Sequence, residues 1–294
     1  MSQMLDPARE FERQRPRLRG LAYRMLGSVA DADDVLQDAY IRWHGAKDVR
    51  EPAAWLTTAV TRLAIDRLRA RTAEREAYVG PWLPEPWLDD ASDRPDRRQD
   101  RADDLSVAFL LLLERLAPEE RAALLLRDVF EIGYPALAAT LDRTEAACRQ
   151  LVHRARERVH AGRRRFTVTE DARRALLDRF LAAVRDGDEA RVLALLAPDA
   201  TLTSDGGGKA WAARNVIRGA DKVARLFLRT TRKAPPTTEH RAAVINGEPA
   251  VVTWVDGRPF ATLSVDIEDD RIAAIYRVMN PDKLGGMAID ARVA

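Results

Sequence analysis

A short proline-rich segment limits how this chain of 294 residues can fold. Pro81, Pro84 and Pro86 lie within six residues of one another, and a regular helix excludes that spacing because each proline lacks the backbone N–H donor. Residues 89–104, which follow, are mostly Asp and Arg, a composition typical of a solvated linker. Because hydrophobic residues recur at helical spacing on both sides, we expect separate compact domains joined by this tether. The length also favours two or three domains, at roughly 150 residues each.

Several classes of protein are excluded by what the chain lacks. No segment approaches the roughly 18 uncharged apolar residues of a membrane-spanning helix. The N-terminus carries Asp6, Glu10 and Glu12 without an apolar core segment, unlike a signal peptide, so we expect a cytoplasmic protein. Cys148 is the single cysteine, and the four histidines are not paired at ligand spacing. We therefore expect no disulfide framework, no metal site and no cofactor.

Residues 134–160 have the pattern of a helix-turn-helix. A first helix at 134–141 ends at Asp142, which tolerates left-handed backbone, and Thr144 is a suitable N-cap for the next helix. The second helix has an apolar stripe with offsets of three and four, and a basic face opposite it. Such a face fits the DNA major groove, although a solvated helix in any bundle has the same pattern. The candidate DNA-contacting residues are Arg149, Gln150, His153, Arg154 and Arg156.

The N-terminal part has the periodicity of three amphipathic helices. The second, at 33–44, presents Asp34, Gln37 and Asp38 on its polar side. The third begins at Pro52, a residue favoured in the first helical turn. We expect a three-helix domain with one acidic and one basic polar face. The polar face of the third helix comprises Thr57, Thr58, Thr61, Arg62, Asp66, Arg67, Arg69 and Arg71.

The C-terminal part has a different, mixed pattern. Amphipathic helices are expected at 171–186, 189–196 and 221–229. Segments 250–255 and 260–267 are rich in strand-forming residues, with Asn246-Gly247 and Asp256-Gly257 as hairpin turns. An all-helical part therefore precedes an α+β part.

Taken together, the helical segments resemble the extracytoplasmic-function sigma factors of RNA polymerase. Residues 17–27, 31–40 and 54–69 are similar to sigma region 2, and the pair at 134–160 is similar to region 4. The resemblance implies all-α region 2 and region 4 domains, followed by an α+β domain. The implied boundaries are region 2 at 8–76, a linker at 77–104, region 4 at 105–165 and the third domain at 169–285.

Roles for individual residues follow from this resemblance. Asp34, Gln37 and Asp38 would contact the β′ clamp helices of core RNA polymerase. The region 4 residues named above would contact the −35 element of promoter DNA. No enzymatic chemistry is implied. The −10 element would be contacted by Thr61, Arg62, Asp66, Arg67, Arg69 and Arg71.

The third domain resembles the SnoaL-like branch of the NTF2-like cone fold. A subfamily of these sigma factors shares the extension, the linker motif Trp82-Leu83-Pro84-Glu85-Pro86, the motif Asp205-Gly206-Gly207-Gly208-Lys209 and the segment 280–284. Both motifs are interpreted as regulatory interdomain contacts, through which the third domain modulates sigma activity. An unidentified small ligand is a further possibility, in a cavity lined by Trp211, Trp254, Phe227 and Tyr276. We expect a monomer when the protein is free.

Two other functions fit parts of the pattern. A one-component regulator would join a ligand-sensing cone to a helix-turn-helix, but this leaves the N-terminal helices unexplained. A SnoaL-like enzyme tethered to DNA is the second alternative. Its catalytic candidates would be His240 and Asp199.

Overall fold

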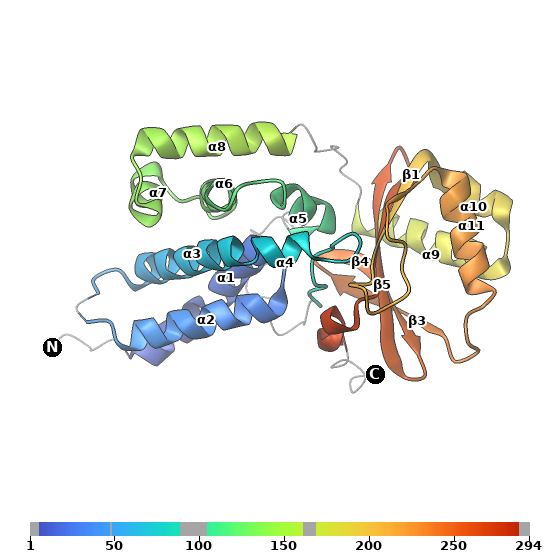
Figure 1. Cartoon of the computed structure of the whole chain (residues 1–294), viewed down its shortest axis with the longest axis horizontal. Coiled ribbons are helices and arrows are strands. Elements are labelled where there is room, and N and C mark those ends of the chain that lie inside the picture. Colours follow the sequence, from blue (N-terminus) through green and yellow to red (C-terminus); the bar gives the residue numbers. More distant parts are fainter. Residues whose placement is uncertain (1–5, 48, 89–104, 161–168, 288–294) are drawn as a thin grey trace. The chain divides into compact units, whose positions relative to one another are not determined.

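The computed structural model describes residues 6–47, 49–88, 105–160 and 169–287 (Figure 1). These residues form two compact units. The first unit contains the N-terminal helices and the helix-turn-helix. The second contains the α+β domain together with the described linker residues 77–88, so the proline-rich segment packs with the C-terminal domain. The linker residues 89–104 lie outside the described residues.

Four helices begin the first unit: α1 (Pro7–Leu26), α2 (Val29–His44), α3 (Pro52–Ala70) and the short α4 (Thr72–Glu76). The break between α1 and α2 is set locally. Gly27 ends α1 with a left-handed backbone, and the Ser28 side chain accepts a hydrogen bond from the Asp31 N–H. This cap makes α2 start four residues earlier than its apolar periodicity predicts. Buried side chains such as Leu21, Leu36 and Leu56 join α1, α2 and α3.

The rest of the first unit comprises α5 (Val107–Leu113), whose first two residues belong to the second unit, α6 (Pro118–Leu124), the π-helix η3 (Leu125–Val129), α7 (Tyr134–Leu141) and α8 (Glu145–His160). The predicted helix-turn-helix is confirmed. Asp142 ends α7 with a φ of 54°, and the Thr144 hydroxyl accepts a hydrogen bond of 3.2 Å from the Ala147 N–H. The apolar stripe of α8, which includes Cys148 and Val152, is buried, and α8 packs on α6. This leaves the basic face of α8 outward.

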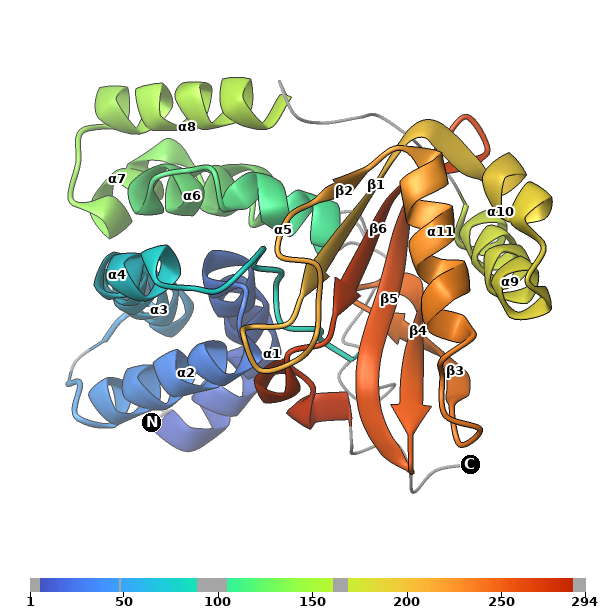
Figure 2. The ribbon, with the colours of Figure 1, turned by 45° about the vertical axis from the view of Figure 1, so that its right-hand side comes forward.

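The second unit combines three helices with a six-stranded sheet (Figure 2). The helices are α9 (Glu170–Asp186), α10 (Glu189–Leu195) and α11 (Ala220–Thr231). The strands are β1 (Leu196–Asp205), β2 (Ile217–Arg218), β3 (Glu239–Ile245), β4 (Glu248–Val255), β5 (Arg258–Glu268) and β6 (Arg271–Val278), followed by the 3-10 helix η4 (Pro281–Lys283). Their order is β2-β1-β6-β5-β4-β3, and only the β1–β6 pairing is parallel. The predicted α+β class is confirmed.

The three helices cover one face of this sheet. Phe180 of α9 and Phe227 of α11 meet edge to face at 5.1 Å between ring centroids, above Val251, Leu263 and Ile275 of the sheet. Both predicted hairpin turns are present, because Asn246 and Asp256 have φ values of 55° and 51° and each precedes a glycine with positive φ. The linker packs against the opposite face of the sheet. Within the described ranges, no helix is long and apolar enough to cross a membrane.

Candidate nucleic-acid interface and linker site

The predicted DNA-binding face of α3 contacts the helix-turn-helix within the first unit. The Arg62 guanidinium donates hydrogen bonds to the backbone carbonyls of Thr140 (2.9 Å) and Ala139 (3.1 Å) at the end of α7. Beside it, the hydroxyls of Thr58 and Thr140 lie 3.1 Å apart. A residue predicted to contact the −10 element is thus bonded to the region predicted to contact the −35 element.

Three threonines of α3 were predicted on the polar face, and the prediction is wrong for two of them. Thr61 is 0% exposed, and its hydroxyl donates a hydrogen bond of 2.7 Å to the Thr57 carbonyl one turn earlier. Thr57 is also buried and accepts a hydrogen bond of 3.0 Å from Arg17 of α1. A threonine in a helix satisfies its hydroxyl on the preceding turn, so its polarity does not require solvent. Thr61 therefore offers no accessible group for a base.

A buried carboxylate organises the end of α3. Asp31 of α2 is 4% exposed and accepts a hydrogen bond of 2.8 Å from Arg67, while Arg71 forms a second ion pair with it. The hydrogen bond that Arg67 donates to Asp31 raises the pKa of Arg67 above its ordinary value. Arg69 reaches Glu119 at 2.8 Å, and Asp66 stays exposed. Asp31 was not among the predicted site residues, because its only local signal is its place in the first turn of α2.

The acidic face of α2 is accessible as predicted. Asp34, Gln37 and Asp38 are all exposed, and Asp34 lies about one helical turn before the other two. Asp34 lies 3.6 Å from Arg67 at their closest charged atoms. The hydrophobic residues between these positions, Val35 and Leu36, are buried against the other helices.

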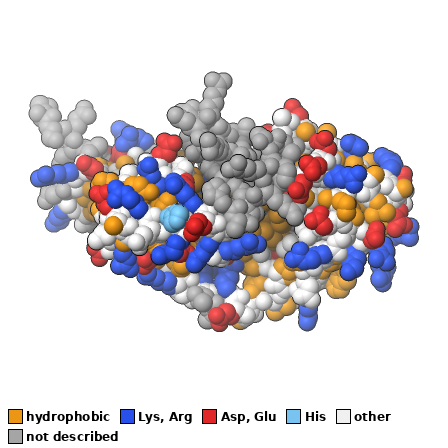
Figure 3. Space-filling view, turned by 90° about the horizontal axis from the view of Figure 1, so that it is seen from above, with side chains coloured by type: hydrophobic (Ala, Val, Ile, Leu, Met, Phe, Trp, Pro, Cys, Tyr) orange, Lys and Arg blue, Asp and Glu red, His pale blue; other side chains and the backbone are white. Residues whose placement is uncertain are grey.

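The five candidate residues of α8 lie together on its outer face, and all are exposed. Arg149 lies over the Tyr134 ring at 4.7 Å and pairs with Glu145 at 2.9 Å. Arg156 pairs with Asp128 at 2.6 Å, which raises the pKa of Arg156. Figure 3 looks onto this side of the first unit and shows Lys and Arg side chains interspersed with acidic ones. The intrahelical and neighbouring acids orient the arginines of α8.

In the second unit, the side chain of Asp205 connects the Asp205–Lys209 motif to the linker motif. It lies at the end of β1 and is 0% exposed. Its carboxylate accepts hydrogen bonds from the Tyr78 hydroxyl (2.6 Å), the Leu83 backbone N–H (2.8 Å) and the Lys283 ammonium (2.7 Å). Lys283 also donates to the Leu83 carbonyl at 2.6 Å. A buried carboxylate with these three donors, one of them a cation, is well compensated, so it fixes the linker to the sheet.

The glycines after Asp205 permit this close approach. Gly207 has a φ of 57°, and a Cβ there would lie 2.2 Å from Asn280 Nδ2 and 3.0 Å from the Tyr78 hydroxyl. A Cβ on Gly206 would lie 2.5 Å from the Ala210 carbonyl oxygen. Asn280 in turn donates a hydrogen bond of 2.9 Å to Tyr78. The Gly-Gly-Gly motif is therefore a packing surface for the linker and for the segment after β6.

The linker motif continues along the sheet. Leu83, Pro84 and Pro86 are buried, and the Lys283 ammonium lies 4.3 Å from the centre of the Trp82 ring. Trp87 and Asn246 exchange hydrogen bonds of 2.8 and 2.9 Å. The structure thus brings the linker motif and Asp205–Gly208 together, whereas Lys209 pairs with Asp282 instead. Tyr78 and Asn246, which carry linker contacts, were missed because nothing local marks them.

Two further possibilities raised for the α+β domain do not fit the structure. The aromatic residues proposed to line one cavity lie apart: Phe227 is in the helix-facing core, Trp254 and Tyr276 lie on strands with their side chains toward the opposite face, and Trp211 is 77% exposed. Asp199 on β1 and His240 on β3 are separated by three strands, so they form no catalytic pair.

Known proteins share the whole arrangement. Residues 11–74 match the family model for sigma-70 region 2, residues 106–159 that for sigma-70 region 4, and residues 177–284 that for the SnoaL-like domain. The Mycobacterium tuberculosis ECF RNA polymerase sigma factor SigJ is 39% identical over 298 residues, covering 97% of this chain and 95% of SigJ. A probable ECF RNA polymerase sigma factor of the same organism, SigI, is 31% identical and 97% of each chain is covered.

The structural comparison agrees with these alignments. The crystal structure of M. tuberculosis SigJ matches with a TM-score of 0.77 at 37% identity, covering 95% of this chain and 98% of that one. The sequence resemblance, the three family models and the full-length fold therefore lead to one assignment. The chain belongs to the extracytoplasmic-function RNA polymerase sigma factors and carries sigma region 2, sigma region 4 and a fused SnoaL-like domain.

Proposed function

We propose that Asp34, Gln37 and Asp38 are the surface through which this sigma factor binds the β′ clamp helices of core RNA polymerase. The protein directs promoter-specific transcription initiation, as its family does. The exposure of all three side chains on one side of α2 supports their role. Acidic and amide groups that are free to exchange water for a partner suit a polar protein interface.

For the −10 element, the proposed contacts come from the exposed end of α3. Asp66, Arg67, Arg69 and Arg71 form a polar track in which basic groups can follow the backbone of an unpaired strand. Arg62 becomes available only when it leaves the carbonyls of Ala139 and Thr140. Phosphate oxygens then replace those carbonyls as acceptors, so the exchange keeps the guanidinium satisfied. Thr61 is omitted from this set because it is buried.

For the −35 element, the proposed contacts are Arg149, Gln150, His153, Arg154 and Arg156 on α8. Their outward placement on the second helix of a helix-turn-helix supports insertion into the major groove. The arginines would contact phosphates and guanine edges, and Gln150 would read a base. The acids paired with Arg149 and Arg156 would hold their side chains extended before DNA arrives.

The fused SnoaL-like domain is proposed to act through the linker. The observation that carries this proposal is the set of hydrogen bonds to buried Asp205 from Tyr78, Leu83 and Lys283. Residues 77–88 belong to the chain segment that joins regions 2 and 4, so holding them on the sheet shortens the free tether. A shorter tether changes the effective concentration of one DNA-binding region once the other is bound.

A transcription assay tests the proposed function. Full-length protein and graded truncations lacking up to residues 168–294 are compared with core polymerase on a cognate promoter. We expect the truncations to change transcript yield, and unchanged yield would contradict regulation by the third domain. Asp34→Lys with Asp38→Lys should abolish binding to core polymerase in a pull-down. Asp178→Lys, an exposed reversal on α9, is the matched control and should bind normally.

The remaining features of the proposal follow from this role. We place the protein in the cytoplasm, where core polymerase transcribes, and expect a monomer in the absence of polymerase. A catalytic role for the SnoaL-like domain is not proposed, because Asp199 and His240 lie on strands separated by three others.

A further inference from the structure

Two successive residues at the end of β1 point to opposite faces of the sheet. Asp205 faces the linker and holds it. Side chains alternate along a strand, so Ser204 lies on the helix-facing side, as Leu202 does within the core. Ser204 is buried and is the register partner of Arg277 on the parallel strand β6. A ligand at Ser204 would therefore be one residue away from the linker attachment.

Arg277 carries a positive charge on this side of the sheet that the described residues do not neutralise. It is paired in register with Leu263 and lies two residues after Ile275, both members of the helix-facing core. Its side chain is largely shielded from solvent. Among the residues that the structure describes, the guanidinium has no hydrogen-bond acceptor or ion-pair partner. Burial lowers the pKa of Arg277 below its ordinary value. Such a charge is costly unless an anion arrives to pair with it.

A histidine of β3 also lies on the helix-facing side of the sheet. His240 lies there, within 3.1 Å of the Thr253 hydroxyl. Its pKa is lowered by burial and further by the positive charges of Arg277 and Arg185. The part of this shift that comes from Arg277 and Arg185 reflects positive charge nearby, and such charge favours an anion.

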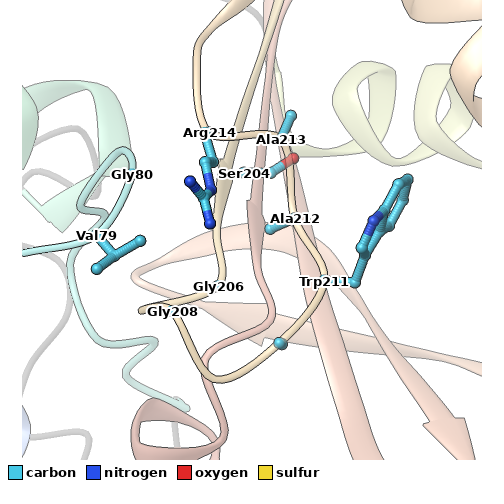
Figure 4. A pocket seen from close by; sticks show the side chains of 10 residues that line it. Val79, Gly80, Ser204, Gly206, Gly208, Trp211, Ala212, Ala213 and Arg214 are labelled. Atoms are coloured by element: carbon cyan, nitrogen blue, oxygen red, sulfur yellow. The ribbon is translucent and has the colours of Figure 1, made fainter.

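A hollow of about 370 Å³ opens beside Ser204 (Figure 4). The loop after the Gly-Gly-Gly motif supplies Trp211 and Arg214 to its lining, and the linker supplies Val79 and Gly80. In Figure 4 the Arg214 side chain extends into the space between Val79 and Ser204. Arg214 likewise has no hydrogen-bond or ion-pair partner in the described part of the chain. Among the described residues, Trp211 is the most exposed of the large hydrophobic side chains, with 77% of its surface accessible.

We propose that this hollow binds a small organic carboxylate with a flat apolar body. The carboxylate is held by Arg214 and the Ser204 hydroxyl, and the neighbouring Arg277 supplies the buried positive charge. The apolar body packs against Trp211 and Val79, which gives an exposed tryptophan a partner. A planar anion suits a site of this kind because guanidinium groups bind carboxylates through two parallel hydrogen bonds.

The bound molecule would also contact the linker directly. Val79 and Gly80 form one wall of the hollow, and Gly208 packs so closely that a Cβ there would lie 3.2 Å from the Val79 Cβ. A ligand in the hollow would therefore lie next to the place where the linker packs on the Gly-Gly-Gly loop. The site goes beyond the proposed sigma function. Only its regulatory consequence depends on that function, and the binding test below needs no polymerase.

The test is a titration of the full-length chain with 2-naphthoate, followed by calorimetry and tryptophan fluorescence. Neutral 2-naphthamide has the same flat body without the charge, and we expect it to bind at least about tenfold more weakly. Arg214→Gln and Arg277→Gln should each weaken naphthoate binding by about tenfold or more. Arg218→Gln is the matched control, because Arg218 is exposed on β2 and does not line the hollow. Equal affinity for the two compounds, or binding unaffected by both Arg214→Gln and Arg277→Gln, would overturn the proposal.

A stability measurement separates a ligand-binding role of Arg277 from a structural one. Arg277→Met removes the uncompensated charge while keeping an unbranched chain of similar shape. We expect its melting temperature without ligand to equal or exceed that of the parent, and naphthoate to stop raising it. A lower melting temperature together with undiminished naphthoate binding would assign Arg277 to packing alone and contradict its place in the site.

Discussion

The backbone N–H of Leu83 donates a hydrogen bond of 2.8 Å to the carboxylate of Asp205, 122 residues further along the chain. This bond ties the centre of the proline-rich linker to the last residue of β1. Prolines at 81, 84 and 86 reduce the number of conformations that the free linker can adopt, so docking it costs less entropy. The linker is therefore preorganised for one specific acceptor.

Removing the Asp205 charge should release the linker. Asp205→Asn removes the negative charge that pairs with the Lys283 ammonium and weakens two further hydrogen bonds, for an expected loss of about 2–4 kcal/mol in the free energy of unfolding. Urea unfolding of the second unit measures this loss, and limited proteolysis reports whether residues 77–88 become accessible. Asp282→Asn breaks only the exposed pair with Lys209 and should cost less than about 1 kcal/mol. Equal effects of the two substitutions would contradict a special role for Asp205.

A methyl group at Gly207 should have a larger effect than one at another left-handed glycine. Gly207→Ala combines a positive φ with a Cβ 2.2 Å from Asn280 Nδ2, and we expect a loss of about 2–4 kcal/mol. Gly257 has a φ of 72°, but a Cβ there would meet no atom within 4 Å, so Gly257→Ala should cost only about 1 kcal/mol. Thermal unfolding of both variants gives the difference. Transcription assays should show altered output for Gly207→Ala and ordinary output for Gly257→Ala.

Loosening the contact between α3 and α7 should favour binding of the −10 strand. Thr140→Val keeps the shape of the side chain and removes the hydroxyl that meets Thr58 at 3.1 Å. Because Arg62 then exchanges its carbonyl partners more readily, we expect the polymerase complex to bind single-stranded −10 DNA several-fold more tightly, measured by fluorescence anisotropy. Thr230→Val in α11 removes a hydroxyl of the second unit and is the control. Unchanged or weaker DNA binding by Thr140→Val would show that this contact does not restrict α3.

The free energy of unfolding should decrease when the pH is lowered through the range in which His240 becomes protonated. Burial, with the charges of Arg277 and Arg185, places the pKa of His240 below its ordinary value in the folded state. The unfolded chain then binds the proton more readily, so stability is fully present above about pH 6.5 and is lost as the pH falls toward the folded pKa. Urea unfolding at about pH 8 and about pH 5.5 measures the change, and His240→Gln should reduce it. A pH dependence of stability in His240→Gln that equals that of the parent would contradict this assignment.

Much of the fold could be predicted from the sequence because it depends on neighbouring residues. The left-handed residues Gly27 and Asp142, the Thr144 cap and both hairpin turns all occur where residue type predicts them. Helical periodicity also placed the apolar stripe of α8 inward and its basic face outward. Each of these features is decided within one or two turns of chain, where side-chain shape and backbone preference act directly.

The sites depended on contacts between distant segments, which local patterns do not specify. Thr61 is polar, yet its hydroxyl is satisfied by its own helix and the residue is buried. The only local signal of Asp31 is its place as an acid in the first turn of α2, but in the folded chain it forms ion pairs with Arg67 and Arg71.

For this protein, the order of residues by itself determined the three regions that the family models match, much of the secondary structure and the kinship with sigma factors. Only the tertiary structure decided that Asp205 meets Leu83 and Lys283, that Arg62 is bonded to α7, and that Arg277 is left beside Ser204 without a partner among the described residues. The physical reason is that such pairings follow from strand order and packing. Those are set by the burial of the whole apolar surface, and no single segment of the chain contains that information.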